Sequence, residues 1–171
     1  MKKDKLKKIL FLSILVAGAI ILNSTDIILT LYLPYFQIGL SHIVSLIILY
    51  MYGRKEMSFV VIFKVLLVSL IWGKLFSPVF FISLAGNFLV IIFYLIGKKH
   101  FNIIPLSIGG SFFNNIGQFL IVYCFFINNN RILIFFSMMM ILGIVSGLII
   151  GYIAKVILKK LKKEGFYDLS F

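Results

Sequence analysis

Long apolar segments separated by short polar breaks dominate the hydrophobic pattern of this chain. A helix that crosses the hydrocarbon core of a bilayer needs about 20 apolar residues at a rise of about 1.5 Å each. Six segments approach that length, at residues 9–30, 38–52, 57–72, 76–96, 104–127 and 132–157. The second and third are short, so we expect them to extend into their flanks or to be shielded by protein. The pattern predicts an all-α integral membrane bundle of about six transmembrane helices.

Composition supports a membrane environment and argues against a soluble protein. Hydrophobic residues make up 62% of the 171 residues, and only five side chains are acidic. A water-soluble surface needs more polar side chains than that. The formal net charge of +12 comes from short clusters between apolar segments rather than from one basic face, so we expect no nucleic-acid partner. The expected partners are membrane lipid and a small-molecule solute.

The distribution of Lys and Arg predicts the orientation. In a six-helix arrangement, the basic residues near the N-terminus, at 54–55, at 98–99 and from 155 onward all fall on one side. Only Lys74 and Arg131 fall on the other side, and Lys64 lies inside a helix. Short positively charged loops stay cytoplasmic, so both termini should be cytoplasmic in a bacterial-type plasma membrane. We expect one multi-pass domain over residues 1–171, with basic cytoplasmic segments at 1–8 and 158–171.

The basic N-terminus followed by an apolar segment also fits a secretory signal. No small-residue cleavage site follows at 23–26, where the sequence is Asn-Ser-Thr-Asp. An even number of helices is also needed to place the basic clusters on one side. Both observations favour a first helix that is retained.

Two ionisable residues, Asp26 and Lys64, lie within the apolar segments. Each costs about 2.5 kcal/mol or more at the bilayer centre unless it is paired or hydrated, so such residues commonly face a cavity or a partner. Asp26 lies about 25 Å along the first helix and Lys64 about 10 Å into the third, which argues against a direct pair. Asp26 could instead be a hydrated residue at a helix end, and Lys64 could reach the cytoplasmic interface.

Uncharged polar residues form a stripe on the fifth segment. They recur at steps of three and four, and the stripe consists of Ser107, Ser111, Asn114, Asn115 and Gln118. Ser83 and Asn87 repeat the spacing on the fourth segment. These amides are candidate ligand-binding residues, together with Lys64, Asp26 and His42. The alternative is that they join helices, for about 0.6 kcal/mol per hydrogen bond.

Gly143, Gly147 and Gly151 recur at four-residue spacing on the last segment, which favours close helix packing rather than a ligand site. Catalytic and metal-binding patterns are missing from the sequence. The two histidines, His42 and His100, are not placed with a nucleophile and a carboxylate, and no phosphate-binding Gly-rich motif occurs. We therefore expect no enzyme activity, no cofactor and no metal site.

Four short segments carry recognisable motifs, at 37–43, 64–70 with Gly73, 83–86 and 114–118. Together they resemble a family of small membrane proteins known as heptaprenyl diphosphate synthase component I, or the Gx transporter family, and the resemblance covers residues 34–151. Segment 37–43 looks like the family's Lys-Leu-Gly-Leu-Ala-Asn-Ile, and 114–118 is similar to His-Asn-x-Gly-Gln. Asn115, Gly117 and Gln118 match directly. The chain departs from the family pattern at Gln37, His42, Lys64 and Asn114, where the family has Lys, Asn, Arg and His.

Members of this family resemble the substrate-binding subunits of energy-coupling-factor transporters, which capture vitamin-like molecules and depend on a separate ATPase module. The resemblance therefore implies a solute-binding component for a vitamin-like or isoprenoid-related molecule, partnered by an ATPase and transmembrane energising module. The family's other name implies a non-catalytic accessory subunit for heptaprenyl diphosphate synthesis. Both functions remain open from the sequence.

Overall fold

The computed structural model describes residues 2–32, 39–125 and 132–163 of the chain. Within them the chain is all α-helical, as predicted, and forms no strand. The helices are α1 (Lys2–Tyr32), α2 (His42–Met51), α3 (Arg54–Ile71), α4 (Pro78–Gly97), α5 (Ile103–Phe125) and α6 (Ile132–Lys163). Helix α6 thus includes the first part of the predicted C-terminal tail, and residues 164–171 of that tail lie outside the described residues.

Helix α2 is shorter than the predicted segment 38–52. It has ten residues and is therefore about 15 Å long, half the thickness of a hydrocarbon core. Gly39 has a φ of 73° before the helix and Gly53 a φ of 105° after it. Both lie in the left-handed region that favours glycine and ends helices. Helix α4 begins with a side-chain cap instead: the Ser77 side chain accepts a hydrogen bond from the Phe80 N–H, and Pro78 occupies the first turn.

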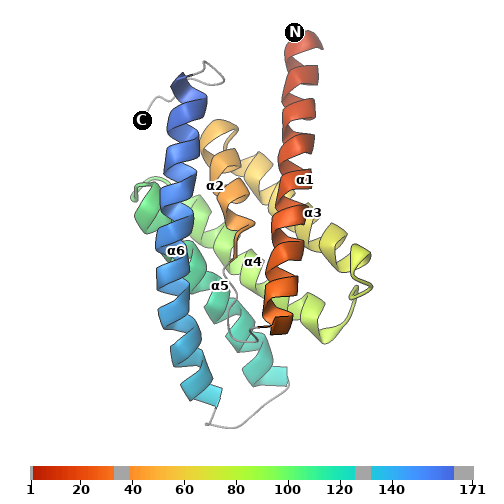
Figure 1. Ribbon diagram of the computed structural model, residues 1–171, viewed down its shortest axis with the longest axis vertical. Coiled ribbons are helices and arrows are strands. Elements are labelled where there is room, and N and C mark those ends of the chain that lie inside the picture. Colours follow the sequence, from red (N-terminus) through yellow and green to blue (C-terminus); the bar gives the residue numbers. More distant parts are fainter. Residues whose placement is uncertain (1, 33–38, 126–131, 164–171) are drawn as a thin grey trace.

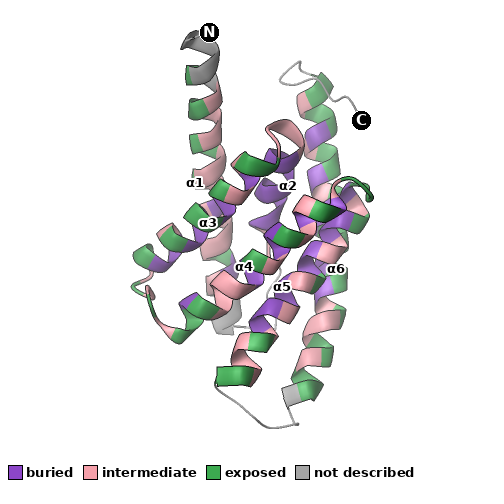
Figure 2. Cartoon of the chain, turned by 180° about the vertical axis from the view of Figure 1, so that it is seen from behind, coloured by how far each residue is buried: buried purple, intermediate pink, exposed green. Residues whose placement is uncertain are grey.

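The short helix α2 lies in the interior of the bundle (Figure 1). It contacts α1, α3, α5 and α6, and its residues from His42 to Leu49 are buried. Figure 2 shows the buried residues gathered on α2 and on the faces of α3, α4 and α5 that are turned towards it. Helix α5 packs between α4 and α6, whereas α1 contacts only α2 and α3 among the described helices.

Among the helices of the described residues, three are long and apolar enough to cross a membrane. The spans are Lys8–Leu29 in α1, Pro78–Gly97 in α4 and Leu133–Lys163 in α6. Their outward faces carry large exposed apolar side chains such as Ile14, Phe88 and Ile141. This is the surface expected of a membrane protein. Helix α3, which carries four charged residues, and helix α5, which carries the amides, are not among these spans, so six crossings remain a prediction.

The N-terminal end of α1, the turn between α2 and α3, and the C-terminal end of α6 lie towards the same end of the molecule (Figure 1). Lys8 on α1 and Glu56 on α3 form a salt bridge there, with 2.5 Å between Nζ and Oε1. This hydrogen bond lowers the pKa of Glu56 below its ordinary value. The basic segments that were predicted to share one side of the membrane are thus close to one end of the fold.

The three glycines of α6 lie against α5. A Cβ atom at Gly147 would come 2.7 Å from the Ile108 Cα and 3.1 Å from the Ser111 Oγ. A Cβ atom at Gly143 would come 2.4 Å from the Asn115 Nδ2, and one at Gly151 would come 2.9 Å from the Ser107 Cβ. These separations are too short for a real side chain. The two backbones approach closely because the α6 positions carry only hydrogen.

Replacing Gly147 with Leu should therefore destabilise the α5–α6 contact. Overpacking of this kind costs about 1–3 kcal/mol, which corresponds to a fall in the thermal unfolding midpoint of about 5 °C. The measurement is thermal unfolding of the purified protein in detergent. Gly18→Leu on α1 is the matched control, because a Cβ atom there would meet nothing within 4 Å. Equal midpoints for both variants would show that the glycine contact does not matter for stability.

Candidate functional site

Lys64 lies at the centre of a group of buried polar side chains that come from four elements. Its side chain is only 1% exposed. Lys64 Nζ donates a hydrogen bond to the Ser41 Oγ, at 2.9 Å, and another to the Asn87 Oδ1, at 3.3 Å. Asn87 is oriented in turn because its Nδ2 donates to the Ser83 carbonyl oxygen at 2.9 Å. Lys64 thus connects the N-terminus of α2 to α3 and α4, and it does not reach the cytoplasmic interface.

Asp26 on α1 is buried close to this lysine. It is 2% exposed, so it is not a hydrated residue at a helix end. The backbone of Gly39, Leu40 and Ser41 lies close to its carboxyl group and interacts with it electrostatically, and its charge interacts with that of Lys64. Within the described residues no salt bridge joins Asp26 to Lys64, and Oδ1 of Asp26 has no hydrogen-bond partner. Asp26 and Lys64 thus form no direct ion pair, as expected, but they are close enough for their charges to interact.

His42 completes the group at the first residue of α2. Its side chain is 5% exposed and is affected by the charge of Lys64. Nδ1 of His42 has no hydrogen-bond partner within the described part of the chain. A Cβ atom at Gly39 would come 3.0 Å from the His42 Cδ2, so glycine lets the turn pass close to the ring. We call Asp26, Ser41, His42, Lys64 and Asn87 the buried polar cluster.

The α5 amides divide between two neighbouring helices. Asn114 and Gln118 are packed against Gly86 of α4, where an added Cβ atom would come 2.6 Å from the Asn114 Oδ1 and 2.9 Å from the Gln118 Cγ. Asn115 faces α6 instead, and its Nδ2 donates to the Met139 carbonyl oxygen at 2.7 Å. All three are buried, and the Asn114 Oδ1 has no partner within the described residues. Asn115 therefore joins α5 to α6 in this conformation.

A small polar cavity lies about one helical turn from the buried polar cluster, between α1, α3 and α4. Its volume is about 110 Å³. Its polar lining comes from Asn23, Ser69, Trp72, Lys74 and Ser83. Ile27 and Val65, which also line it, directly follow Asp26 and Lys64 in the sequence. The cavity is smaller than the roughly 300–1,000 Å³ of typical small-molecule sites, so it holds only a few atoms in this conformation.

The chemistry available to this group is binding rather than bond cleavage. Ser41 and Lys64 are spaced like a nucleophile and its base, but they are only 3% and 1% exposed. A substrate carbonyl would have to reach the Ser41 Oγ through packed protein. Across the described ranges, no group of three His, Cys, Asp or Glu side chains is arranged to hold a metal ion. An ammonium has three donors, and two of the Lys64 donors are used within the described structure.

Ser41 is a site residue that the sequence did not predict. The signal that could have identified it is its position as the N-cap of α2, inside the motif at 37–43. Gln37, which was also part of that motif, lies outside the described residues. Trp72 was missed as well: its Nε1 donates to the Ser24 Oγ at 3.2 Å and closes one side of the polar cavity.

Comparison with known proteins gives one result. No curated protein and no solved structure matches the chain. A family model described as heptaprenyl diphosphate synthase component I matches residues 15–157, which include α2, α3, α4 and α5 completely, parts of α1 and α6, and every member of the buried polar cluster. This match covers most of the sequence and agrees with the resemblance seen in the short motifs. The chain therefore belongs to the heptaprenyl diphosphate synthase component I family.

Proposed function

We propose that this protein is the solute-binding membrane component of a transporter. The observation that carries the proposal is the buried polar cluster, in which Lys64 and Asp26 are interior charges beside a polar cavity. Ionisable residues inside a membrane are expensive and commonly mark substrate or ion pathways. A purely structural role is a weaker explanation, because the Asp26 Oδ1 and the His42 Nδ1 have no partner within the described residues.

The solute would be a small polar molecule. Lys64 has a spare donor, while Asp26 and His42 offer acceptors, so a ligand with both kinds of group would satisfy all three. The cavity of about 110 Å³ must enlarge to admit a vitamin-sized molecule or one of isoprenoid origin. The most direct way is a movement of α1, which contacts only α2 and α3 among the described helices.

In this proposal the protein crosses the plasma membrane six times with both termini in the cytoplasm. The basic residues at 54–55 and 98–99 then lie inside, and the polar cavity with Lys74 faces outside. The protein has no nucleotide-binding motif, so energy for uptake would come from a separate ATPase and transmembrane module. This arrangement is the one implied by the resemblance to energy-coupling-factor substrate-binding subunits.

The family match favours a second candidate function. Its description names a component of a prenyl diphosphate synthase, which implies a protein partner. In this role the chain is a non-catalytic accessory subunit that holds a soluble synthase, or its lipid product, at the membrane. The buried polar cluster would then serve mainly to hold α1 to α4 together.

The two functions predict different partners. Gentle purification followed by mass spectrometry should recover two ATPases and a long transmembrane subunit if the chain is a transport component. Recovery of an Asp-rich prenyl synthase instead would favour the accessory role and count against transport. The same sample, analysed by native mass spectrometry, identifies a bound solute.

Removing polar groups from the site should weaken binding of the solute so identified. Lys64→Met removes the ammonium, and Gln118→Leu tests whether the α5 amides contribute when the cavity opens. A buried group left without its partner costs about 1–3 kcal/mol, so we expect affinity to fall about tenfold in each variant. Calorimetric titration of the purified variants measures it. Lys155→Met, an exposed lysine on α6, is the control. Full affinity in Lys64→Met and Gln118→Leu with intact folding would place the solute elsewhere.

The orientation is tested by labelling single cysteines in intact cells. The native Cys124 is exposed and must first be replaced by Ser. Cysteines introduced at Lys3, Lys99 and Lys162 should react only after the membrane is permeabilised, whereas one at Asn129 should react from outside. Position 129 lies outside the described residues, so labelling there is an independent measurement of its side of the membrane. External labelling at position 162 would contradict the six-helix topology.

A further inference from the structure

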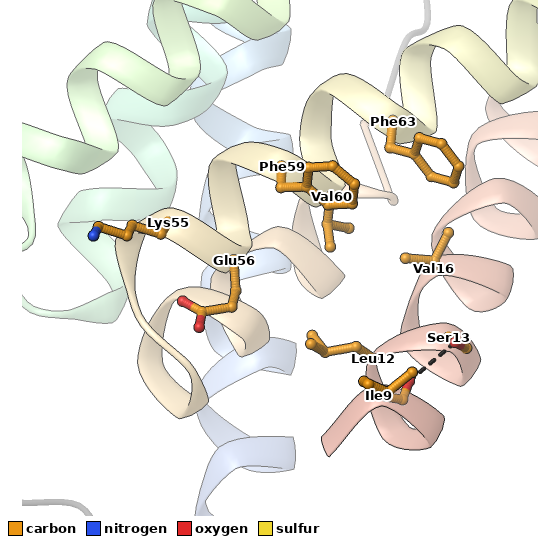
Figure 3. Close-up of a pocket in the computed structure, with 9 residues that line it drawn as sticks. All are labelled: Ile9, Leu12, Ser13, Val16, Lys55, Glu56, Phe59, Val60 and Phe63. Carbon is orange, nitrogen blue, oxygen red and sulfur yellow. Dashed lines mark hydrogen bonds between the residues drawn. The ribbon is translucent and has the colours of Figure 1, made fainter. Parts of the chain in front are cut away.

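A groove runs between α1 and α3 on the outer surface of the bundle, away from the buried polar cluster. Its volume is about 580 Å³. Figure 3 shows Phe59, Val60 and Phe63 of α3 on one side and Leu12 and Val16 of α1 on the other. The Phe59 and Phe63 rings are stacked with centroids 5.5 Å apart. The groove is therefore walled by apolar side chains along most of its length.

One end of the groove is charged. Lys55 and Glu56 line this end, and the Lys55 side chain extends away from the apolar residues (Figure 3). Glu56 is neutralised by its salt bridge to Lys8, whose Nζ also lies 5.5 Å from the centroid of the Tyr52 ring. Lys55 acts electrostatically on Glu56, but no hydrogen bond to Lys55 is present within the described residues. Lys55 thus leaves a net positive charge at this end of the groove.

The apolar walls alone would not select a ligand, because lipid chains outside the groove are as apolar as the groove itself. Selectivity has to come from the charged end. Basic pockets between transmembrane helices on the cytoplasmic side bind anionic headgroups, at about 1 kcal/mol for each Lys or Arg near the surface.

We infer that the α1–α3 groove is a binding site for an anionic phospholipid, with one hydrocarbon chain between the helices and the headgroup phosphate at Lys55. The site is separate from the proposed solute site. It depends on the proposed orientation only for the leaflet, which is the cytoplasmic one.

Native mass spectrometry of the full-length protein in detergent tests the inference. The probes are phosphatidylglycerol and phosphatidylcholine with identical chains, because they differ only in the headgroup, which is anionic in the first lipid and zwitterionic in the second. Phosphatidylglycerol should bind at least about fivefold more tightly. Lys55→Gln should remove about fivefold of that preference, which is the effect of one basic side chain at about 1 kcal/mol. Lys99→Gln, another exposed lysine that does not line the groove, should leave it unchanged.

A second pair of variants tests the groove itself. Ser13 lines it, so Ser13→Phe should fill the space and reduce binding of phosphatidylglycerol by at least fivefold. Ala17→Phe places the same side chain one turn further along α1, outside the lining, and should have little effect. Circular dichroism and thermal unfolding establish that all variants are folded.

Several results would overturn the inference. Equal affinity for the two lipids would show that the site does not recognise an anionic headgroup. Equal losses of affinity in Lys55→Gln and Lys99→Gln would show that the preference comes from general surface charge and not from Lys55. Equal effects of Ser13→Phe and Ala17→Phe on binding would show that the lipid does not bind in the groove. Competition by inorganic phosphate as strong as that by phosphatidylglycerol would exclude the hydrocarbon chain. Displacement of phosphatidylglycerol by a tenfold lower concentration of farnesyl diphosphate would assign the groove to a different amphiphile.

Discussion

The arrangement of α1 to α4 depends on one buried charge. Lys64 is held inside the bundle by the Ser41 hydroxyl and the Asn87 amide, and Asp26 supplies the opposite charge from α1. A buried charge that loses its partners costs several kcal/mol, so these four elements separate only when other polar groups, such as those of a ligand, replace the lost partners. The Gly39–Ser41 turn contributes to the same linkage. Its backbone lies beside the Asp26 carboxyl group, and the Ser41 hydroxyl accepts a hydrogen bond from Lys64.

The other half of the bundle is held together differently. Helices α5 and α6 meet through small residues, and their close backbone approach gives many weak contacts instead of a few strong polar ones. The Asn115 to Met139 hydrogen bond lies within this contact. The α5–α6 pair is therefore held by close packing, whereas α1 to α4 are held by buried polar groups. A change of ligand or charge has a larger effect on the arrangement of α1 to α4.

The sequence predicted the helices well, because long apolar segments and glycine-rich breaks are local signals. Helix α4 at Pro78–Gly97 differs by one or two residues from its predicted range of 76–96. The length of α2 was less predictable, because the two glycine turns that end it depend on φ values that the apolar pattern does not contain. The family was also recognisable, since its motifs are continuous in the sequence.

The site was predictable only in its residue types. Asp26, His42, Lys64 and Asn87 were all candidates. Asp26 and Lys64 were expected to lie apart, because their depths in the membrane were calculated from straight helices that all begin at the same level. The turn that brings them together connects segments distant in sequence. Similarly, the polar stripe on α5 was read as one face. Successive helical residues are turned by about 100°, and this rotation is enough to send Asn114 to α4 and Asn115 to α6.

The short, enclosed helix α2 has a consequence for how this protein is made. A segment of about 15 Å cannot cross a bilayer core by itself, and α3 carries a lysine that is unfavourable in lipid until Ser41 and Asn87 surround it. In the proposed six-crossing topology, neither helix is therefore expected to enter the membrane as an independent unit. Their insertion would coincide with packing against the neighbouring helices, so that biogenesis and folding of this half of the chain would be one cooperative event.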